Sequence, residues 1–306
     1  MKAGKILKII PTFNLSKKKQ IVIGVLLIIP LFFIPWFLSI PVGVLSTSLG
    51  KYLGIPYLGR IILRLWQIIL AYISGLIGLK LILGKTDLGF NRGNDLNYFL
   101  TGIFAGGGSV LLIFLLMIWA GFLRIETFAW QSMSIISFLG VLITYIISNL
   151  SIGFIEEIPF RGYLVQVLDS NCGIFMTVVL SGLIFSGWHL ILNPLASVSQ
   201  ILWLLFELIP AGLILSWVFL NTKSMWLVIG LHSSYNFMQQ ALDIYGRYGF
   251  NDSWDNLIFL GTRVKGSQIL VGTPQGSAGL VQLAGTILMG IIMIVYIKNK
   301  ENQTGL

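Results

Sequence analysis

The stretch SIISFLGVLITYIISNLSIGFIEEIPFR, residues 134–161, has no charged side chain before its last six residues, which hold two glutamates and an arginine. A transmembrane helix needs about 20 consecutive apolar residues, so 134–155 is predicted to span a membrane. The run is continuous, which favours a helix over the alternating strands of a membrane barrel. A charge at bilayer depth costs roughly 2.5–3.5 kcal/mol. Glu156, Glu157 and Arg161 are therefore candidates for a function.

Similar apolar runs recur along the whole chain of 306 residues, which is 56% hydrophobic and 10% charged. A soluble domain carries about 25% charged residues, so we predict an integral membrane protein. The fold class expected is an all-α polytopic membrane helix bundle with about eight transmembrane helices. The eight predicted spans lie near 21–41, 61–84, 98–123, 134–155, 174–192, 198–220, 225–241 and 277–297.

The order of charged and apolar segments divides the chain into regions. The run that begins at Ile21 exceeds the 7–15 residues of a signal-peptide core, so it is interpreted as a retained signal anchor. The expected regions are a basic cytoplasmic N-terminal segment (1–20), N-terminal transmembrane helices (21–125), a helix core that holds the candidate functional residues (126–241), a polar loop (242–276), and the last transmembrane helix with the C-terminal tail (277–306).

Charge indicates how the protein sits in its membrane. The net charge is +9, and thirteen of the twenty Lys and Arg residues fall on the side that holds both termini in this topology. Positive charge accumulates on the cytoplasmic side and attracts anionic lipid. We therefore expect cytoplasmic N- and C-termini, a bacterial cell membrane as the location, anionic lipid as a partner, and no nucleic-acid partner. The single cysteine, Cys172, excludes an intramolecular disulfide.

Helix geometry separates the roles of the paired glutamates. Neighbouring residues on a helix point about 100° apart, so Glu156 and Glu157 cannot face one site in the same way. Arg161 follows Glu157 by four residues, the spacing that brings side chains together on one face. Glu157 is the predicted ion-pair partner of Arg161, which leaves Glu156 free to act. Pro159, without a backbone N–H, is expected to free the carbonyl of Ile155 and to kink the helix.

The only two histidines, His189 and His232, also lie in apolar runs. Either histidine alone could simply make a structural hydrogen bond. His232 and Asn236, four residues later, could together form a polar contact between helices. Counting at 1.5 Å per residue from the turn near 169–173 places Glu156 and His189 at one level. Two antiparallel neighbouring helices would bring these side chains together. The occurrence of both histidines, the paired glutamates and Asn236 in one region of the chain favours a single site. The depth of the site stays open, because His232 falls near the inner side and His189 precedes Asn193-Pro194 on the outer side.

Small residues mark predicted close contacts between helices. Gly102 and Gly106 form a small-xxx-small pair of the kind that allows backbones to approach in lipid. Gly182 and Gly187 thin the helix that carries His189, so that a neighbouring helix or a peptide can come near the imidazole.

Three motifs carry a resemblance to a known family: EExxxR at 156–161, FxxxH at 185–189 and HxxxN at 232–236. In this order they resemble the CPBP (ABI/CAAX-type) intramembrane proteases, over roughly residues 130–240. That family includes type II CAAX prenyl endopeptidases and bacteriocin-processing or self-immunity proteins. The resemblance implies that Glu156 and His189 activate a water, that His232 and Asn236 hold the oxyanion, and that Glu157 and Arg161 fix the geometry.

Two alternatives remain open for a cofactor. One carboxylate with two imidazoles, Glu156, His189 and His232, is also a zinc ligand set. A mechanism without a metal fits His232 and Asn236 as donors on one helix face, and no HExxH motif is present.

The resulting functional hypothesis is an intramembrane endopeptidase that cleaves a membrane-associated protein or peptide. The alternatives are a non-catalytic membrane scaffold or immunity protein, for which degenerate motifs would be expected, and a proton-coupled transporter. The transporter hypothesis depends on Glu207, because an intramembrane glutamate is a functional candidate by default. The substrate, the role of prenylation and the oligomeric state do not follow from the sequence.

Overall fold

Helices dominate the computed structural model, which describes residues 10–304 apart from 132, 193–197, 245–258, 267–269 and 271–278. The main elements are α2 (Lys17–Tyr52), α3 (Pro56–Leu83), α4 (Asp95–Trp119), β1 (Leu123–Phe128), α5 (Ile135–Glu157), the π-helix η2 (Ile158–Val165), α6 (Gln166–Cys172), α7 (Ile174–Leu192), α8 (Val198–Thr222), α9 (Met225–Ala241), β2 (Leu260–Val264) and α11 (Leu280–Thr304). A short 3-10 turn, η1 (Ala129–Gln131), follows β1.

The prediction of an all-α polytopic bundle is confirmed. Within the described residues, seven helical segments are long and apolar enough to cross a membrane. The remaining predicted span is α9, which has 17 residues and falls short of the length of a typical span. Its Leu227 and Leu231 are fully buried, so α9 is an internal helix surrounded by the others.

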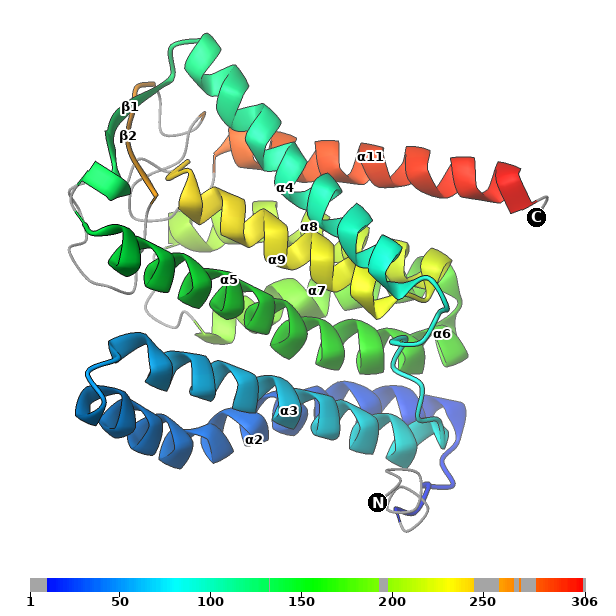
Figure 1. Cartoon of the computed structure of the whole chain (residues 1–306). Coiled ribbons are helices and arrows are strands. Elements are labelled where there is room, and N and C mark those ends of the chain that lie inside the picture. The colour runs from blue at the N-terminus through cyan, green and yellow to red at the C-terminus, as the bar shows by residue number, and fades with distance from the viewer. Residues whose placement is uncertain are drawn as a thin grey trace.

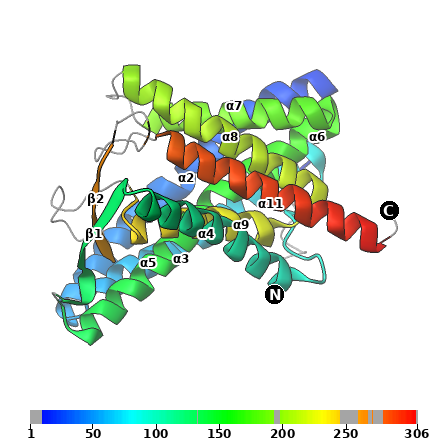
Figure 2. The same cartoon turned by 90° about the horizontal axis from the view of Figure 1, so that it is seen from above.

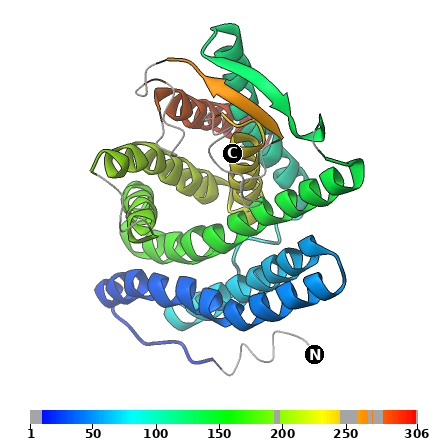
Figure 3. The same cartoon turned by 90° about the vertical axis from the view of Figure 1, so that its left-hand side faces the viewer.

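The helices form two unequal layers. The antiparallel pair α2 and α3 lies on one side of α5, and α4, α7, α8, α9 and α11 lie on the other (Figures 1 and 3). Seen from above, α11 crosses the bundle beside α8 (Figure 2), and it packs against both α4 and α8. The hydroxyl of Tyr163 donates to the carbonyl of Gly24 at 3.0 Å, which ties the α2–α3 layer to η2.

Glycines allow α4 and α9 to touch through their backbones. A Cβ added at Gly102 or Gly106 would collide with backbone atoms of Leu231, and one added at Gly230 would lie 3.2 Å from the Cα of Gly102. The predicted close contact of the Gly102–Gly106 pair is confirmed. It holds α9, with His232, at a fixed position in the bundle.

The helix that begins at Ile135 does not end where its apolar run does. It continues through η2 into α6, and the continuous segment Ile135–Cys172 has 38 residues. All eight residues of η2 are buried. The sequence predicted a kink at Pro159, and the structure instead has a π-helix there, which widens the turns after a proline that cannot donate a backbone bond. π-helical turns occur frequently at functional sites.

A two-stranded antiparallel sheet closes one end of the bundle (Figure 1), and the sequence analysis missed it. β1 pairs with β2, with Leu123 opposite Val264 and Phe128 opposite Leu260. β2 lies inside the region expected to be a polar loop, most of which falls outside the described residues. The buried Asp243 accepts a bond of 2.9 Å from the backbone N–H of Thr262, which fastens the end of α9 to β2.

Candidate active site

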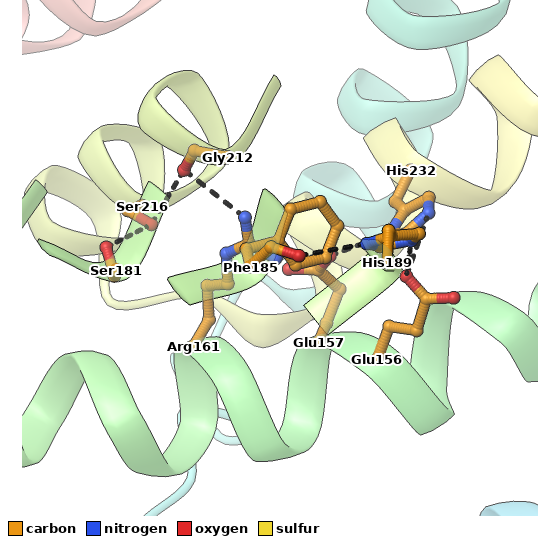
Figure 4. A network of polar contacts seen from close by, with 9 residues as sticks. All are labelled: Glu156, Glu157, Arg161, Ser181, Phe185, His189, Gly212, Ser216 and His232. Carbon is orange, nitrogen blue, oxygen red and sulfur yellow. Dashed lines mark hydrogen bonds and ion pairs between the residues drawn. The ribbon is translucent and has the colours of Figure 1, made fainter. Parts of the chain in front are cut away.

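The last turn of α5 delivers the two glutamates to different environments. The Glu157 side chain is fully buried, whereas that of Glu156 is 16% exposed and lines a cavity. In Figure 4 the carboxylate of Glu156 points to the two imidazoles, and that of Glu157 lies beside Arg161 and Phe185. The predicted divergence of the neighbouring glutamates is therefore observed.

Glu157 and Arg161 form the ion pair predicted from their spacing. Nη1 of Arg161 donates to Oε1 of Glu157 at 2.9 Å, and both side chains have no exposure. Nη2 of Arg161 donates to the carbonyl of Gly212 on α8 at 3.3 Å, and the guanidinium lies 4.5 Å from the ring centre of Phe185 on α7. Arg161 thus joins three helical segments behind the cavity.

The same glutamate also holds His232, a contact not anticipated from the sequence. Nδ1 of His232 lies 2.7 Å from Oε1 of Glu157. Because a carboxylate only accepts hydrogen bonds, Nδ1 carries the proton and donates it. Nε2 of His232 is then directed away from Glu157, on the side of Glu156, at 3.8 Å from its Oε2.

His189 approaches Glu156 from a second helix. Its Nδ1 lies 2.9 Å from the carbonyl oxygen of Phe185, one turn earlier on α7, so Nδ1 again carries a proton. Its Nε2 lies 3.7 Å from Oε2 of Glu156. The level matching between Glu156 and His189 that was predicted by counting residues from the turn is confirmed.

The helix bounds show how far along its own helix each of the three side chains lies. α7 runs unbroken to Leu192, so His189 lies within its last turn. His232 lies in the middle of the short α9, and Glu156 is followed by more than ten further residues of helix before Cys172. The three side chains meet because α5 with its extension is much longer than α7 and α9.

These residues line a cavity of about 200 Å³ between α5, α7, α8, α9 and α11. Asn236 lines it one turn after His232, on the same face of α9. Glu207 of α8 and Gln239 of α9 also line the cavity, and Nε2 of Gln239 donates to Oε1 of Glu207 over a long distance of 3.4 Å. The lining residues are Glu156, Phe185, His189, Glu207, Leu208, Ala211, Leu215, His232, Tyr235, Asn236, Gln239, Thr286 and Met289.

Several of these residues escaped the sequence analysis. Tyr235 donates its hydroxyl proton to the carbonyl of Gln282 at 3.0 Å, and its oxygen lies 3.0 Å from Oγ1 of Thr286. Thr286 comes from α11, and no motif marks it. The sequence feature that could have indicated Thr286 is a polar residue within an apolar run.

Small side chains let α7 and α8 touch behind the cavity. A Cβ added at Gly212 would lie 2.9 Å from the Cα of Gly182, so a neighbouring helix uses the space that these glycines leave. Ser181 donates to Ser216 at 2.8 Å, and Ser216 donates to the carbonyl of Gly212 at 2.8 Å (Figure 4). The Gly212 carbonyl therefore accepts hydrogen bonds from both Ser216 and Arg161.

Residues 138–238 match the model of a protein family described as type II CAAX prenyl endopeptidase, Rce1-like. This segment belongs to the CAAX-type family. No curated protein and no solved structure matches the chain significantly. The CAAX-type segment covers about a third of the chain and contains all three motifs; it begins within α5 and ends within α9. The family resemblance is thus confirmed, and the molecule is an integral membrane protein with a CAAX-type intramembrane protease fold in this segment.

A metal was a possible component of the CAAX-type site. The donor types of Glu156, His189 and His232 suit zinc, and acceptors at both Nδ1 atoms are typical of ligating histidines. Over the described part of the chain, however, no three His, Cys, Asp or Glu side chains are arranged to hold a metal ion. The side chains as placed do not form a preformed metal site.

Proposed function

We propose that the protein is an intramembrane endopeptidase that hydrolyses a peptide bond of a membrane-associated protein or peptide. The observation that carries this proposal is the convergence of one carboxylate oxygen and two imidazole nitrogens on one cavity. Oε2 of Glu156 lies 3.7 Å from Nε2 of His189 and 3.8 Å from Nε2 of His232. This oxygen is buried and has no hydrogen-bond partner among the residues that the structure describes. An ionisable side chain inside a membrane span costs free energy, so a carboxylate at this position is a candidate for a function.

In the proposed first step, Glu156 removes a proton from a water molecule in the cavity. The Nε2 atom of His189 holds the same water and orients it. The water oxygen bonds to the carbonyl carbon of the substrate, and the carbonyl π electrons move to the oxygen. Positioning of the attacking water and removal of its proton are each effective only at hydrogen-bond distance. Oε2 of Glu156 and Nε2 of His189 are 3.7 Å apart, so one water could contact both.

Asn236 and His232 stabilise the oxyanion that forms. The amide of Asn236 donates an N–H, and His232 in its protonated form donates from Nε2 while Glu157 accepts from Nδ1 and balances the imidazolium charge. Preorganised donors of this kind act strongly where water is excluded. When the tetrahedral intermediate collapses, the C–N bond breaks and protonated Glu156 returns its proton to the leaving nitrogen. The products are a carboxylic acid and an amine, and Glu156 is regenerated.

The experiment is a comparison of protein termini in membranes from cells that express wild type or Glu156→Gln at equal levels. We expect termini that appear only with wild type. Glu126→Gln is the matched control, because Glu126 lies on β1 and its ion pairs among the described residues are distant ones of 3.9 Å to the exposed Arg124 and Arg263. It should give the wild-type profile.

Identical profiles for wild type and Glu156→Gln would contradict the proposal. If Glu156→Gln also rescued the phenotype of a deletion, a scaffold function would replace the enzymatic one. Substrate-dependent proton flux that requires Glu207 would instead favour a transporter.

A further inference from the structure

A second cavity reaches Glu156 from the opposite side of α5. It lies between α2, α3 and α5 and has a volume of about 170 Å³. The first cavity, which contains the two histidines, lies on the side of α7, α8 and α9. Glu156 lines both cavities, so its side chain stands at their junction. No step of the proposed hydrolysis uses the second cavity.

The wall of the second cavity combines apolar side chains with polar ones. Arg64 and Gln67 of α3 line it together with Glu156. Nη1 of Arg64 donates to Oε1 of Gln67 at 3.1 Å, which fixes the orientation of the amide. Gln67 is 8% exposed although it lies within an apolar span. Polar and ionisable side chains inside transmembrane segments typically face the bundle interior or a water-filled cavity.

A polar stripe on α3 leads to this cavity. Four polar side chains at intervals of three, four and three residues share one face of the helix: Tyr57, Arg60, Arg64 and Gln67. The stripe faces α5 at its start, because a Cβ added at Gly140 of α5 would lie 2.7 Å from the ring of Tyr57. From Tyr57 to Gln67 the helix rises about 15 Å, which is half of the roughly 30 Å of a hydrocarbon core.

The stripe ends where the second cavity lies. Ala71, four residues after Gln67 on the same face, is 1% exposed, and a Cβ added at Gly75 would collide with Ile158 of η2. Beyond the cavity α3 is therefore tightly packed, whereas Arg60 and Arg64 before it are half-buried. Polar access along α3 thus comes from the end of the bundle where α5 begins.

Water is the ligand that fits both this cavity and the proposed chemistry. Each cleavage consumes one water molecule, and a substrate seated against the histidines covers the first cavity. The volume of about 170 Å³ far exceeds the roughly 10–15 Å³ that hold one water. A buried water needs about two to four polar partners, whereas apolar cavities stay dry. The amide of Gln67 and the carboxylate of Glu156 are partners of this kind on the wall.

We propose that the second cavity is filled with water and supplies the hydrolytic water to Glu156 while the substrate occupies the first cavity. The water enters along the polar stripe of α3. This inference rests on the proposed endopeptidase function and adds the path of its second reactant. The arginines of the stripe serve this path by their polarity, whether or not they also contact other protein groups. Gln67 acts as a positioning residue, since it holds water without joining the chemistry.

Cysteine labelling tests the hydration of the second cavity without relying on proteolysis. The single native cysteine is removed as Cys172→Ser, and Ile152→Cys is introduced on the cavity wall. Ile146→Cys is the matched control, because Ile146 lies on the same helix and is 47% exposed on its apolar outer surface. Ile155→Cys, also on the cavity wall, is a second test position.

The full-length variants are compared in liposomes after their unfolding temperatures have been matched to that of Cys172→Ser. We expect the cysteines of the cavity wall to react with a charged, water-soluble methanethiosulfonate and the control cysteine to resist it. An uncharged, lipid-soluble maleimide should reach the control cysteine. If the wall cysteines also resisted the charged reagent, the cavity would hold lipid or substrate instead of water, and the proposal would be overturned.

Kinetics then tests whether this water is the one consumed. Gln67→Leu removes the amide and should lower kcat by about tenfold, a loss typical of one hydrogen bond, with KM unchanged because the substrate binds in the first cavity. Ile152→Trp, which fills the second cavity, should also lower kcat, and Ile146→Trp on the outer surface should not. Gln67→Asn keeps an amide and should recover part of the rate. A merely structural role of Gln67 would instead change KM and the unfolding temperature.

The two proposals fail in different ways. An unchanged kcat in Gln67→Leu and Ile152→Trp, with cuts that still require Glu156, would overturn the water supply and keep the endopeptidase. The absence of any cut that depends on Glu156 would overturn the endopeptidase and with it the supply, whether or not the cavity takes the label.

Discussion

Glu157 and His232 are 75 residues apart in the sequence, yet Oε1 of Glu157 lies 2.7 Å from Nδ1 of His232. The same oxygen accepts a bond of 2.9 Å from Arg161. One buried carboxylate oxygen therefore sets both the orientation of the imidazole and the position of the arginine that ties η2 to α8.

The Glu157–Arg161 pair should respond strongly to the loss of one partner. Arg161→Met leaves the Glu157 carboxylate in the core without its arginine partner, and breaking a buried pair in this way typically costs about 3–5 kcal/mol. We expect a clear fall in the thermal unfolding temperature of the detergent-purified protein. The double variant Glu157→Gln with Arg161→Met should recover most of that stability, since no charge remains buried.

Activity should separate from stability in the same double variant. His232 then loses the carboxylate that balances its protonated form, so proteolysis should stay low although the fold is recovered. A double variant as active as wild type would show that Glu157 does not act through His232.

Asn236 is the other donor expected at the oxyanion. Removal of one such donor costs about 10²–10³-fold in rate in well-studied cases. Asn236→Ala should lower kcat by about this factor with a small change in KM. The control is Asn221→Ala, at the exposed end of α8, where the side chain donates to the carbonyl of Trp217 at 2.7 Å. A rise in KM with kcat unchanged would instead assign Asn236 to substrate binding.

The glycines of α4 offer a matched pair of substitutions. A Cβ at Gly106 would press on the backbone of Leu231, while one at Gly108 would meet nothing within 4 Å. Overpacking typically costs about 1–3 kcal/mol, so Gly106→Ala should lower stability and displace α9 with His232. Gly108→Ala should be neutral or slightly stabilising, because alanine favours a helix by roughly 0.5–1 kcal/mol over glycine. Equal unfolding temperatures for the two variants would show that the close approach of Gly106 to Leu231 does not contribute to stability.

Metal removal tests the proposed use of the protein's own side chains. Within the described residues, no three His, Cys, Asp or Glu side chains are placed to hold a metal ion. We expect proteolysis to persist after dialysis against a strong chelator, and elemental analysis to find no stoichiometric zinc. Loss of activity on chelation, with recovery on addition of zinc alone, would assign Glu156, His189 and His232 as ligands.

Local relationships were predictable from the sequence because they depend on helix geometry alone. The apolar runs specify where helices form, and the four-residue spacing of Glu157 and Arg161 specifies their ion pair. The same rise per residue placed Glu156 and His189 at one level across a turn. These predictions needed no knowledge of how distant helices pack.

Contacts between distant segments were decided only by the tertiary structure. The bond between Glu157 and His232 depends on how α9 crosses α5, which is set by backbone contacts at Gly102 and Gly106 of α4. Thr286 reaches the cavity because α11 packs against α8, and β2 finds β1 after more than a hundred intervening residues. The sequence by itself determined the helices, the motif residues and their local pairs, because these follow from periodicity and spacing. Which of those residues meet, and that a second carboxylate shares their cavity, depends on helix packing, and no local periodicity encodes it.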